Sequence, residues 1–296
     1  MSRAWRRFVR DRGAVTGAVL VAALVAIAVL GPLLSSHDPL ASDIDHGLSA
    51  LGAPLPPSSA AWLGTDTLGR DEWARVVAGA ASSLTIAAAA TAIALAIGLA
   101  VGLSAGYAGG VIDSALMRLV DLVLAFPFVL LAILLAAVFH GAGFASARAP
   151  VFLTLGVLSW TPLARVLRAK TRVVMRGDLV TAARAIGAGP WRIMTHHVLP
   201  NVAGAVIALT TLGFAQVLLA EAVLSFVGLG PPPPAASWGR MLYESRAYYR
   251  TAPALVIAPG VAIFLAVVGF NLLGEGLRHL LSPARDPLVL DAEDVR

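Results

Sequence analysis

Six long runs of apolar residues, separated by polar or glycine- and proline-containing segments, dominate the pattern of this 296-residue chain. The runs cover residues 13–34, 84–107, 119–139, 151–167, 202–227 and 255–277. Each approaches the length of about 20 residues that a helix needs to cross the hydrocarbon core of a bilayer. The pattern therefore predicts an all-α integral membrane protein with six transmembrane helices.

The composition agrees with a membrane location. Hydrophobic residues make up 58% of the chain and charged residues only 13%, too few polar side chains to cover a soluble globule. In a soluble protein the net charge of +5 would suggest a nucleic-acid partner. Here the basic residues lie beside apolar runs, which is typical of loops that follow the positive-inside rule. We therefore expect the lipid bilayer, and not nucleic acid, as a partner.

Two basic regions predict the orientation of the chain. The first run is preceded by five arginines: Arg3, Arg6, Arg7, Arg10 and Arg12. The connection 165–200 carries lysine or arginine at seven positions against the single acid Asp178. With six spans, both regions face the cytoplasm if the amino terminus does. The first run is too long for the apolar part of a signal peptide and has no clear cleavage site, so we expect an uncleaved anchor.

Within the basic connection, residues 181–201 read TAARAIGAGPWRIMTHHVLPN. Gly187 stands where a helix needs a left-handed terminator, and Pro190 stands where a new helix can begin without losing a hydrogen bond. Thr181 is an acceptable cap for the start of the first helix. The pattern predicts two short helices that meet at residues 187–189. The adjacent His196 and His197 point in different directions on a helix and cannot form an i, i+4 metal pair.

This segment resembles the EAA loop of bacterial ABC importer permeases, the cytoplasmic element that seats in a groove of the ATPase subunit. The resemblance rests on Thr181, Ala182, Ala183, Gly187, Leu199 and Pro200. Thr181 departs from the family pattern, which has a glutamate there. The resemblance implies the fold of type I ABC importers, with cytoplasmic coupling helices. It also implies a homologous second permease, two cytoplasmic ATPases and an external substrate-binding protein as partners.

A second resemblance lies between the first two runs, where residues 62–71 read WLGTDTLGRD. This segment is similar to the same region of C-type permeases for dipeptides, oligopeptides or nickel. Gly64 and Gly69 permit tight turns, and Asp71 is placed to cap a helix. We expect that helix to lie along the outer interface before the second span begins. The clustered aspartates lack the spacing of a calcium loop, which favours capping and turn roles.

The resulting division of the chain has four parts. Residues 1–34 form the cytoplasmic amino terminus and first span, and residues 35–83 an external segment with the interfacial helix. Residues 84–283 form the permease domain, with the coupling loop at about 170–200, and residues 284–296 a cytoplasmic tail. The sequence has no internal repeat of the kind that builds many secondary transporters.

Acids inside apolar runs are costly and are candidates for function. Asp121 has Arg118 one turn earlier on the same face, so a local ion pair competes with a pathway role. Glu221 shares a face with Ser225. It could line the translocation cavity or form a hydrogen bond to the outer loop, and the two alternatives have similar weight. Asn271 and Glu275, one turn apart in the last run, are expected to pack helices or to contact the coupling loop.

The chain carries no sequence signature of catalysis. Its only lysine, Lys170, follows Ala169, so no phosphate-binding G-x-x-x-x-G-K-[ST] loop exists. No catalytic or metal motif is present, so we expect no cofactor on this chain, with ATP and Mg²⁺ held by partner subunits. The two resemblances imply the function of a bacterial inner-membrane permease subunit of an ATP-driven importer for peptides, or alternatively for nickel or another metal chelate. The rival class is a secondary carrier in which Asp121 and Glu221 move coupling protons.

Overall fold

The computed structural model describes residues 8–34, 37–144, 146 and 148–281. The tail 284–296 and Arg3, Arg6 and Arg7 lie outside these residues. The described part is helical, with two isolated β-bridges and no strand. Its helices are α2 (Arg12–Leu34), α3 (Glu72–Ala108), α4 (Gly110–Ala125), α5 (Phe128–Gly141), α6 (Ala149–Leu158), α7 (Thr161–Met175), α8 (Asp178–Ala185), α9 (Pro190–Ile193), η1 (Met194–Val198), α10 (Leu199–Leu224), η2 (Ser225–Leu229), α11 (Trp238–Ser245) and α12 (Ala254–Leu281).

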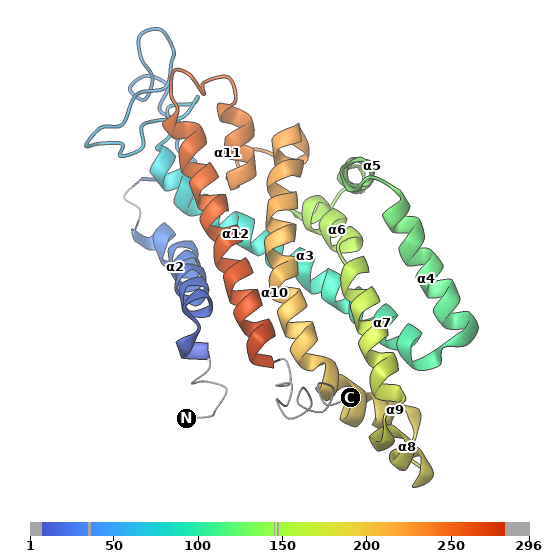
Figure 1. Cartoon of the computed structure of the whole chain (residues 1–296). Helices are drawn as coiled ribbons and strands as arrows, with labels where there is room; N and C mark the ends of the chain where they lie inside the picture. Colours follow the sequence, from blue (N-terminus) through green and yellow to red (C-terminus); the bar gives the residue numbers. More distant parts are fainter. Residues whose placement is uncertain (1–7, 35–36, 145, 147, 282–296) are drawn as a thin grey trace, which may run out of the picture.

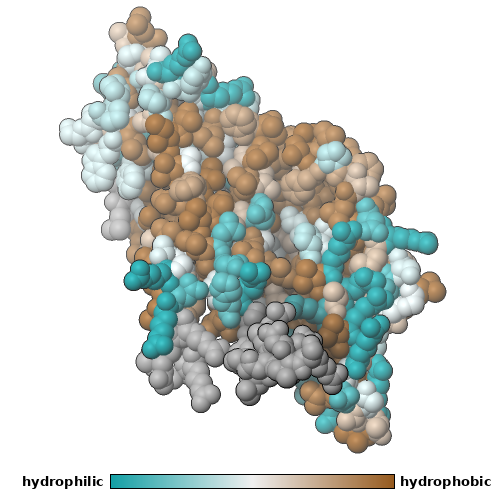
Figure 2. Space-filling model, in the orientation of Figure 1, coloured by the Kyte–Doolittle hydropathy of each residue, from teal (hydrophilic) through white to brown (hydrophobic). Residues whose placement is uncertain are grey.

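The described helices provide five elements long and apolar enough to cross a membrane, or six if one bent pair is a single span. On the face shown in Figure 2, hydrophobic residues cover a broad band across the upper middle, and polar residues gather above it and over the lower half. The elements α11 and α8–α9 lie at opposite ends of the helical body (Figure 1). The predicted all-α membrane fold is confirmed.

The third predicted span, 119–139, is not a straight helix. It is divided between α4 and α5, which meet at an angle of 96°. The break falls at Phe126, whose backbone is extended (φ −93°, ψ 141°) immediately before Pro127. A proline ring clashes with a helical conformation of the residue before it, which accounts for the bend. We call the segment 125–128 the elbow.

The second predicted span begins earlier than hydropathy indicated. Residues 72–83 form the first turns of α3, so a separate interfacial helix is wrong. Asp71 caps this helix as predicted, with its carboxylate accepting a hydrogen bond from the N–H of Trp73 at 2.9 Å. At about 1.5 Å per residue, the 37 residues of α3 span about 55 Å, well beyond a hydrocarbon core of about 30 Å. Helix α3 must therefore either tilt strongly in the bilayer or extend beyond its hydrocarbon core at one end.

A stripe of glycines on α3 seats α7 against it. A Cβ added at Gly102 would lie 2.8 Å from the carbonyl oxygen of Ala164, and one at Gly106 would lie 2.6 Å from Cβ of Thr171. Small residues at four-residue spacing let two helix backbones approach closely in a membrane. Helix α7, which leads directly into the predicted coupling loop, therefore packs closely against α3, the longest of the described helices.

Candidate functional site

The loop between α8 and α9 ends one helix and starts another as the sequence predicts. Gly187 has φ +83°. The N–H of Gly187 donates to the carbonyl of Arg184 at 2.9 Å, and the N–H of Ala188 donates to the carbonyl of Ala183 at 2.9 Å. These two bonds form a Schellman motif, whose left-handed residue is usually glycine. The next helix begins at Pro190, where the missing N–H costs nothing.

The predicted cap at Thr181 is wrong. Helix α8 begins at Asp178 with Gly177 in the capping position, so Thr181 lies inside the helix. Its hydroxyl donates to the carbonyl of Gly177 at 3.3 Å and the side chain is exposed. Ala182 is exposed beside it and Ala183 is buried. Threonine in place of the family's glutamate at position 181 therefore changes the exposed face of α8 and does not affect how the helix begins.

Large apolar side chains are exposed around this loop. The exposed fractions of Leu179, Ile186 and Trp191 are 70%, 84% and 80%. The exposed Arg184 and Arg192 flank them. We call these five residues the docking face. An apolar patch with a polar rim at the tip of a membrane protein is typical of an interaction surface.

The opposite side of the loop is anchored in the body. Val180, Ile193 and Val198 are buried in one apolar cluster with Leu163, Leu167 and Val202 of the spans. Leu199 and Pro200, the last residues of the predicted motif, form the first turn of α10. The docking face is therefore joined to α7 and α10 by one continuous set of packed apolar side chains.

A cavity of about 680 Å³ lies between the elbow, the α6–α7 junction and α10. Phe126, Phe128, Leu163 and Leu209 are among its apolar walls. The polar side chains lining it are Ser159, Thr161, Gln216 and Asn271, and none of its lining residues is charged. Such a cavity accommodates a small solute through shape and a few neutral hydrogen bonds.

The candidate pathway residues Glu221 and Ser225 do not line this cavity. Glu221 is 1% exposed and accepts hydrogen bonds from Ser225 at 2.7 Å and from Ser83 at 3.3 Å. Ser83 in turn accepts a hydrogen bond at 3.1 Å from the backbone N–H of Trp238, the first residue of α11. Of the two alternatives, the geometry favours the outer loop, which Glu221 reaches through the hydroxyl of Ser83. Glu221 ties α3, α10 and α11 together.

Asp121 pairs across the fold and not within its own helix. Its carboxylate forms an ion pair with Arg165 of α7, so the predicted local pair with Arg118 is wrong. Asn271 lines the cavity, whereas Glu275 pairs with Arg278 in its own helix. Neither Asp121 nor Glu275 belongs to the cavity wall.

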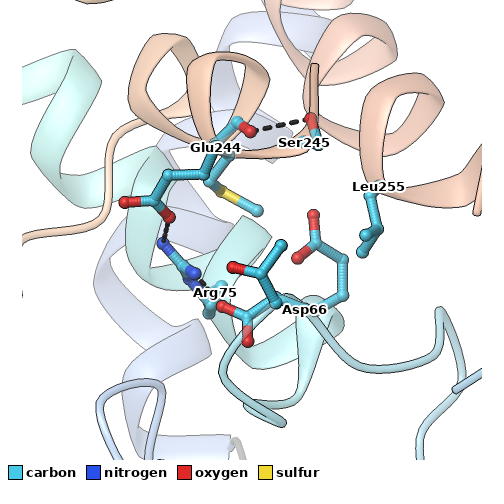
Figure 3. Close-up of a pocket in the computed structure, with 8 residues that line it drawn as sticks. Asp66, Arg75, Glu244, Ser245 and Leu255 are labelled. Carbon is cyan, nitrogen blue, oxygen red and sulfur yellow. Dashed lines mark hydrogen bonds and ion pairs between the residues drawn. The ribbon is translucent and has the colours of Figure 1, made fainter. Parts of the chain in front are cut away.

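An ionic network at the other end of the molecule was not foreseen from the sequence (Figure 3). Arg75 lies between Asp66 and Glu244, donating to Glu244 at 2.8 Å and pairing with Asp66. Arg70 contacts the same two acids at 2.6 and 3.3 Å, and Arg240 donates to Glu244 at 2.8 Å. We call these five residues the outer network. It fastens the segment before α3 to α11.

The charges of this network follow from their surroundings. Burial raises the pKa of Glu244, but Arg75, Arg240 and Arg70 outweigh it and hold the pKa below the ordinary value of 4.5. Asp66 also accepts from the N–H groups of Leu68 and Arg70, as the predicted turn role requires.

Among the described residues, no three His, Asp or Glu side chains converge on a metal site.

The fold defines the class of this chain. It superimposes on a chain in crystal structures of the MetNI methionine ABC transporter in inward-facing conformations. The TM-score is 0.58, with 19% identity, over 71% of this chain and 97% of that one. A second crystal form of that transporter gives a TM-score of 0.55 at 20% identity, over 70% of this chain and 96% of that one. This chain therefore has the membrane-domain fold of type I ABC importers.

Family comparison completes the assignment. Residues 98–286 match the model of the binding-protein-dependent transport system inner membrane component, and residues 1–57 match the N-terminal transmembrane domain of oligopeptide transport permease C. The chain belongs to this family of binding-protein-dependent permeases and is the permease subunit of an ABC importer. The predicted C-type resemblance is confirmed.

Curated relatives extend the likeness over nearly the whole chain. The glutathione transport system permease protein GsiD of Shigella flexneri serotype 5b is 40% identical over 94% of this chain and 89% of its own length. GsiD of Pectobacterium atrosepticum and of Escherichia coli O157:H7 are each 38% identical over the same shares.

Proposed function

We propose that this chain forms one half of the membrane pathway through which an ATP-driven importer admits small peptides of the size of glutathione. The observation that carries the proposal is the pairing of an exposed apolar docking face at one end with an uncharged cavity in the helical body. The names of the GsiD relatives support a peptide-like solute. Neutral polar groups in the cavity suit a peptide backbone, whose amides need donors and acceptors rather than a counter-ion.

The proposal includes four partner subunits. A homologous permease covers the elbow side of the cavity, where Leu122, Leu130 and Leu134 are exposed by 58%, 63% and 60%. Two cytoplasmic ATPases, which hold ATP and Mg²⁺, receive the docking faces of the two permeases. An external binding protein delivers the solute. Closure of the ATPases moves the docking face and switches the paired permeases between inward and outward access.

Orientation follows from the same assignment. The docking face lies in the cytoplasm, the amino terminus lies on the same side, and the outer network faces the binding protein. A reporter fused after Trp62 is expected to read external, and one fused after Arg176 is expected to read cytoplasmic. A cytoplasmic signal at the first position or an external one at the second would contradict this topology.

Purification and reconstitution test the function. The tagged chain, extracted from its native membrane, is expected to copurify with an ATP-hydrolysing subunit and a second permease. In liposomes, the complex should take up labelled glutathione only with ATP and the binding protein present. Labelled dipeptides and nickel are the comparison solutes. Uptake by the chain alone, driven by a proton gradient, would contradict the proposal.

A further inference from the structure

Helix α4 has few buried residues, and its apolar attachment to α3 and α7 is one cluster in which Val120 lies with Ala94 and Ala164. Its only buried residues are Asp113 and Val120. It begins at Gly110, directly after Gly109. The φ values of these two glycines, +54° and +64°, are costly for other residues, and a Cβ on either would meet nothing within 4 Å. It ends at the elbow. Helix α4 is thus a rigid rod between a glycine joint and a bend.

Acid–arginine pairs join this rod to α7. The carboxylate of Asp113 accepts from Nε and Nη2 of Arg168, the latter at 2.7 Å, and from Arg172. Further along, Asp121 pairs with Arg165. Later positions on α4 meet earlier positions on α7, so the two helices run antiparallel with their charges in register. We call these five residues the strap.

The strap is anchored most strongly at Asp113. Its side chain is only 5% exposed, whereas Asp121 is 63% exposed. A two-point contact between an arginine and a buried carboxylate is stronger and more directional than an exposed ion pair. Helix α7 is itself fixed to α3 by the glycine stripe and leads through Arg176 and Gly177 into α8. The strap therefore connects α4 to α7, the helix that leads into the docking face.

We propose that the strap makes α4 move with α7, so that a displacement of the docking face repositions the elbow residues Phe126 and Phe128 in the cavity wall. Asp113 is a positioning residue: it touches no solute, and it acts by passing the movement of α7 to the elbow. This inference rests on the proposed import function. It assigns to one buried carboxylate the link between ATP hydrolysis and access to the cavity.

Spin-label distances test whether the two helices move together. The chain has no cysteine, so Val111→Cys on α4 and Lys170→Cys on α7 place one label on each exposed position. In the assembled complex, trapping the ATPases closed should change the distance between the labels by less than about 2 Å, the scale of ordinary helix shifts. With Asp113→Asn the change should exceed about 5 Å, one helical turn. A large change in the parent would overturn the proposal.

Transport stoichiometry tests whether the link matters. Asp113→Asn should leave assembly and ATP hydrolysis near the parent level and lower the peptide imported per ATP by about tenfold, the effect of losing one charge-assisted contact. Exchanging the charges with Asp113→Arg and Arg168→Asp should restore most of that ratio, since a guanidinium at position 113 and a carboxylate at position 168 again form an ion pair between α4 and α7. Glu275→Gln, which removes the ion pairs of Glu275 with Arg278 and His279 inside α12, is the matched control and should match the parent.

The outcomes separate the strap from the function on which it rests. If the parent complex shows no ATP-dependent import, the proposed function itself fails and the strap fails with it. If the parent imports, but Asp113→Asn hydrolyses and imports at the parent ratio, the strap alone is refuted. Loss of assembly in Asp113→Asn, without rescue by the charge exchange, would assign Asp113 to folding and also refute it.

Discussion

Replacing Gly187 by valine is expected to abolish recruitment of the ATPases while leaving the membrane domain folded. Gly187 occupies a left-handed conformation at φ +83°, and a Cβ there would meet nothing within 4 Å. The cost is therefore purely conformational, roughly 1 to 2 kcal/mol or more for a β-branched residue. Relieving that strain breaks the Schellman bonds and redirects α9, so that Ile186 and Trp191 no longer share one surface.

The same loop supplies a matched control. Gly189 also has open space around it, but its φ is −72°, which valine adopts without strain. Gly189→Val should therefore retain ATPase binding. Copurification and substrate-stimulated ATP hydrolysis measure both variants, and pairing with the sister permease checks assembly. If Gly187→Val equals Gly189→Val in both assays, the loop is a connector and not a docking element. Thr181→Glu should be tolerated, because position 181 is exposed on α8.

Features that depend on local chemistry were accessible from the sequence. The spans follow from the length of apolar runs, and the α8–α9 turn follows from the spacing of Gly187 and Pro190. The elbow was also accessible, because Pro127 disfavours helix at Phe126, yet hydropathy runs through both residues without a break. Similarly, no glycine or proline separates residues 72–83 from the second span, which is why α3 is continuous.

Features that depend on distant partners were not accessible. The i, i+3 rule paired Asp121 with Arg118, but the packing of α4 on α7 places Arg165 closer in space. Arg75 and Glu244 are 169 residues apart in the sequence. No periodicity or motif relates them. Their contact is set by the position of α11 on the end of α3, which a single sequence does not specify.

Replacing Arg75 by methionine is expected to destabilise the outer end of the molecule severely. The change keeps most of the apolar stem but leaves Asp66 and Glu244 with fewer cationic partners. The side chains of Arg75 and Asp66 are only 2% and 6% exposed, so water does not compensate. Removing one partner of a buried ion pair lowers the free energy of unfolding by about 3–5 kcal/mol. We expect a loss at the lower end of this range, because Arg70 still pairs with both acids. Thermal unfolding of the detergent-solubilised complex measures it.

Arg240→Met is the matched control, because Arg240 pairs with Glu244 only within α11 and is itself 16% exposed. Arg240→Met should lower the free energy of unfolding by well under half as much as Arg75→Met does, as expected for an i, i+4 pair that is partly hydrated. Equal shifts in the unfolding midpoint for the two variants would contradict a special role for Arg75. The double variant Asp66→Asn, Arg75→Met should be less destabilised than the sum of the single changes, since each single change already removes the same ion pair between Asp66 and Arg75.

Acid provides an independent measure of the same contacts. The arginines hold the pKa of Glu244 below 4.5, so its ionised form contributes stability that is fully present above that value. As the pH falls through the lowered value, Glu244 takes up a proton in the folded state and the contribution is lost. The unfolding midpoint of the parent should therefore fall steeply below pH 4.5, and that of Arg75→Met should fall less. The same pH dependence in both proteins would show that Arg75 does not set the charge of Glu244.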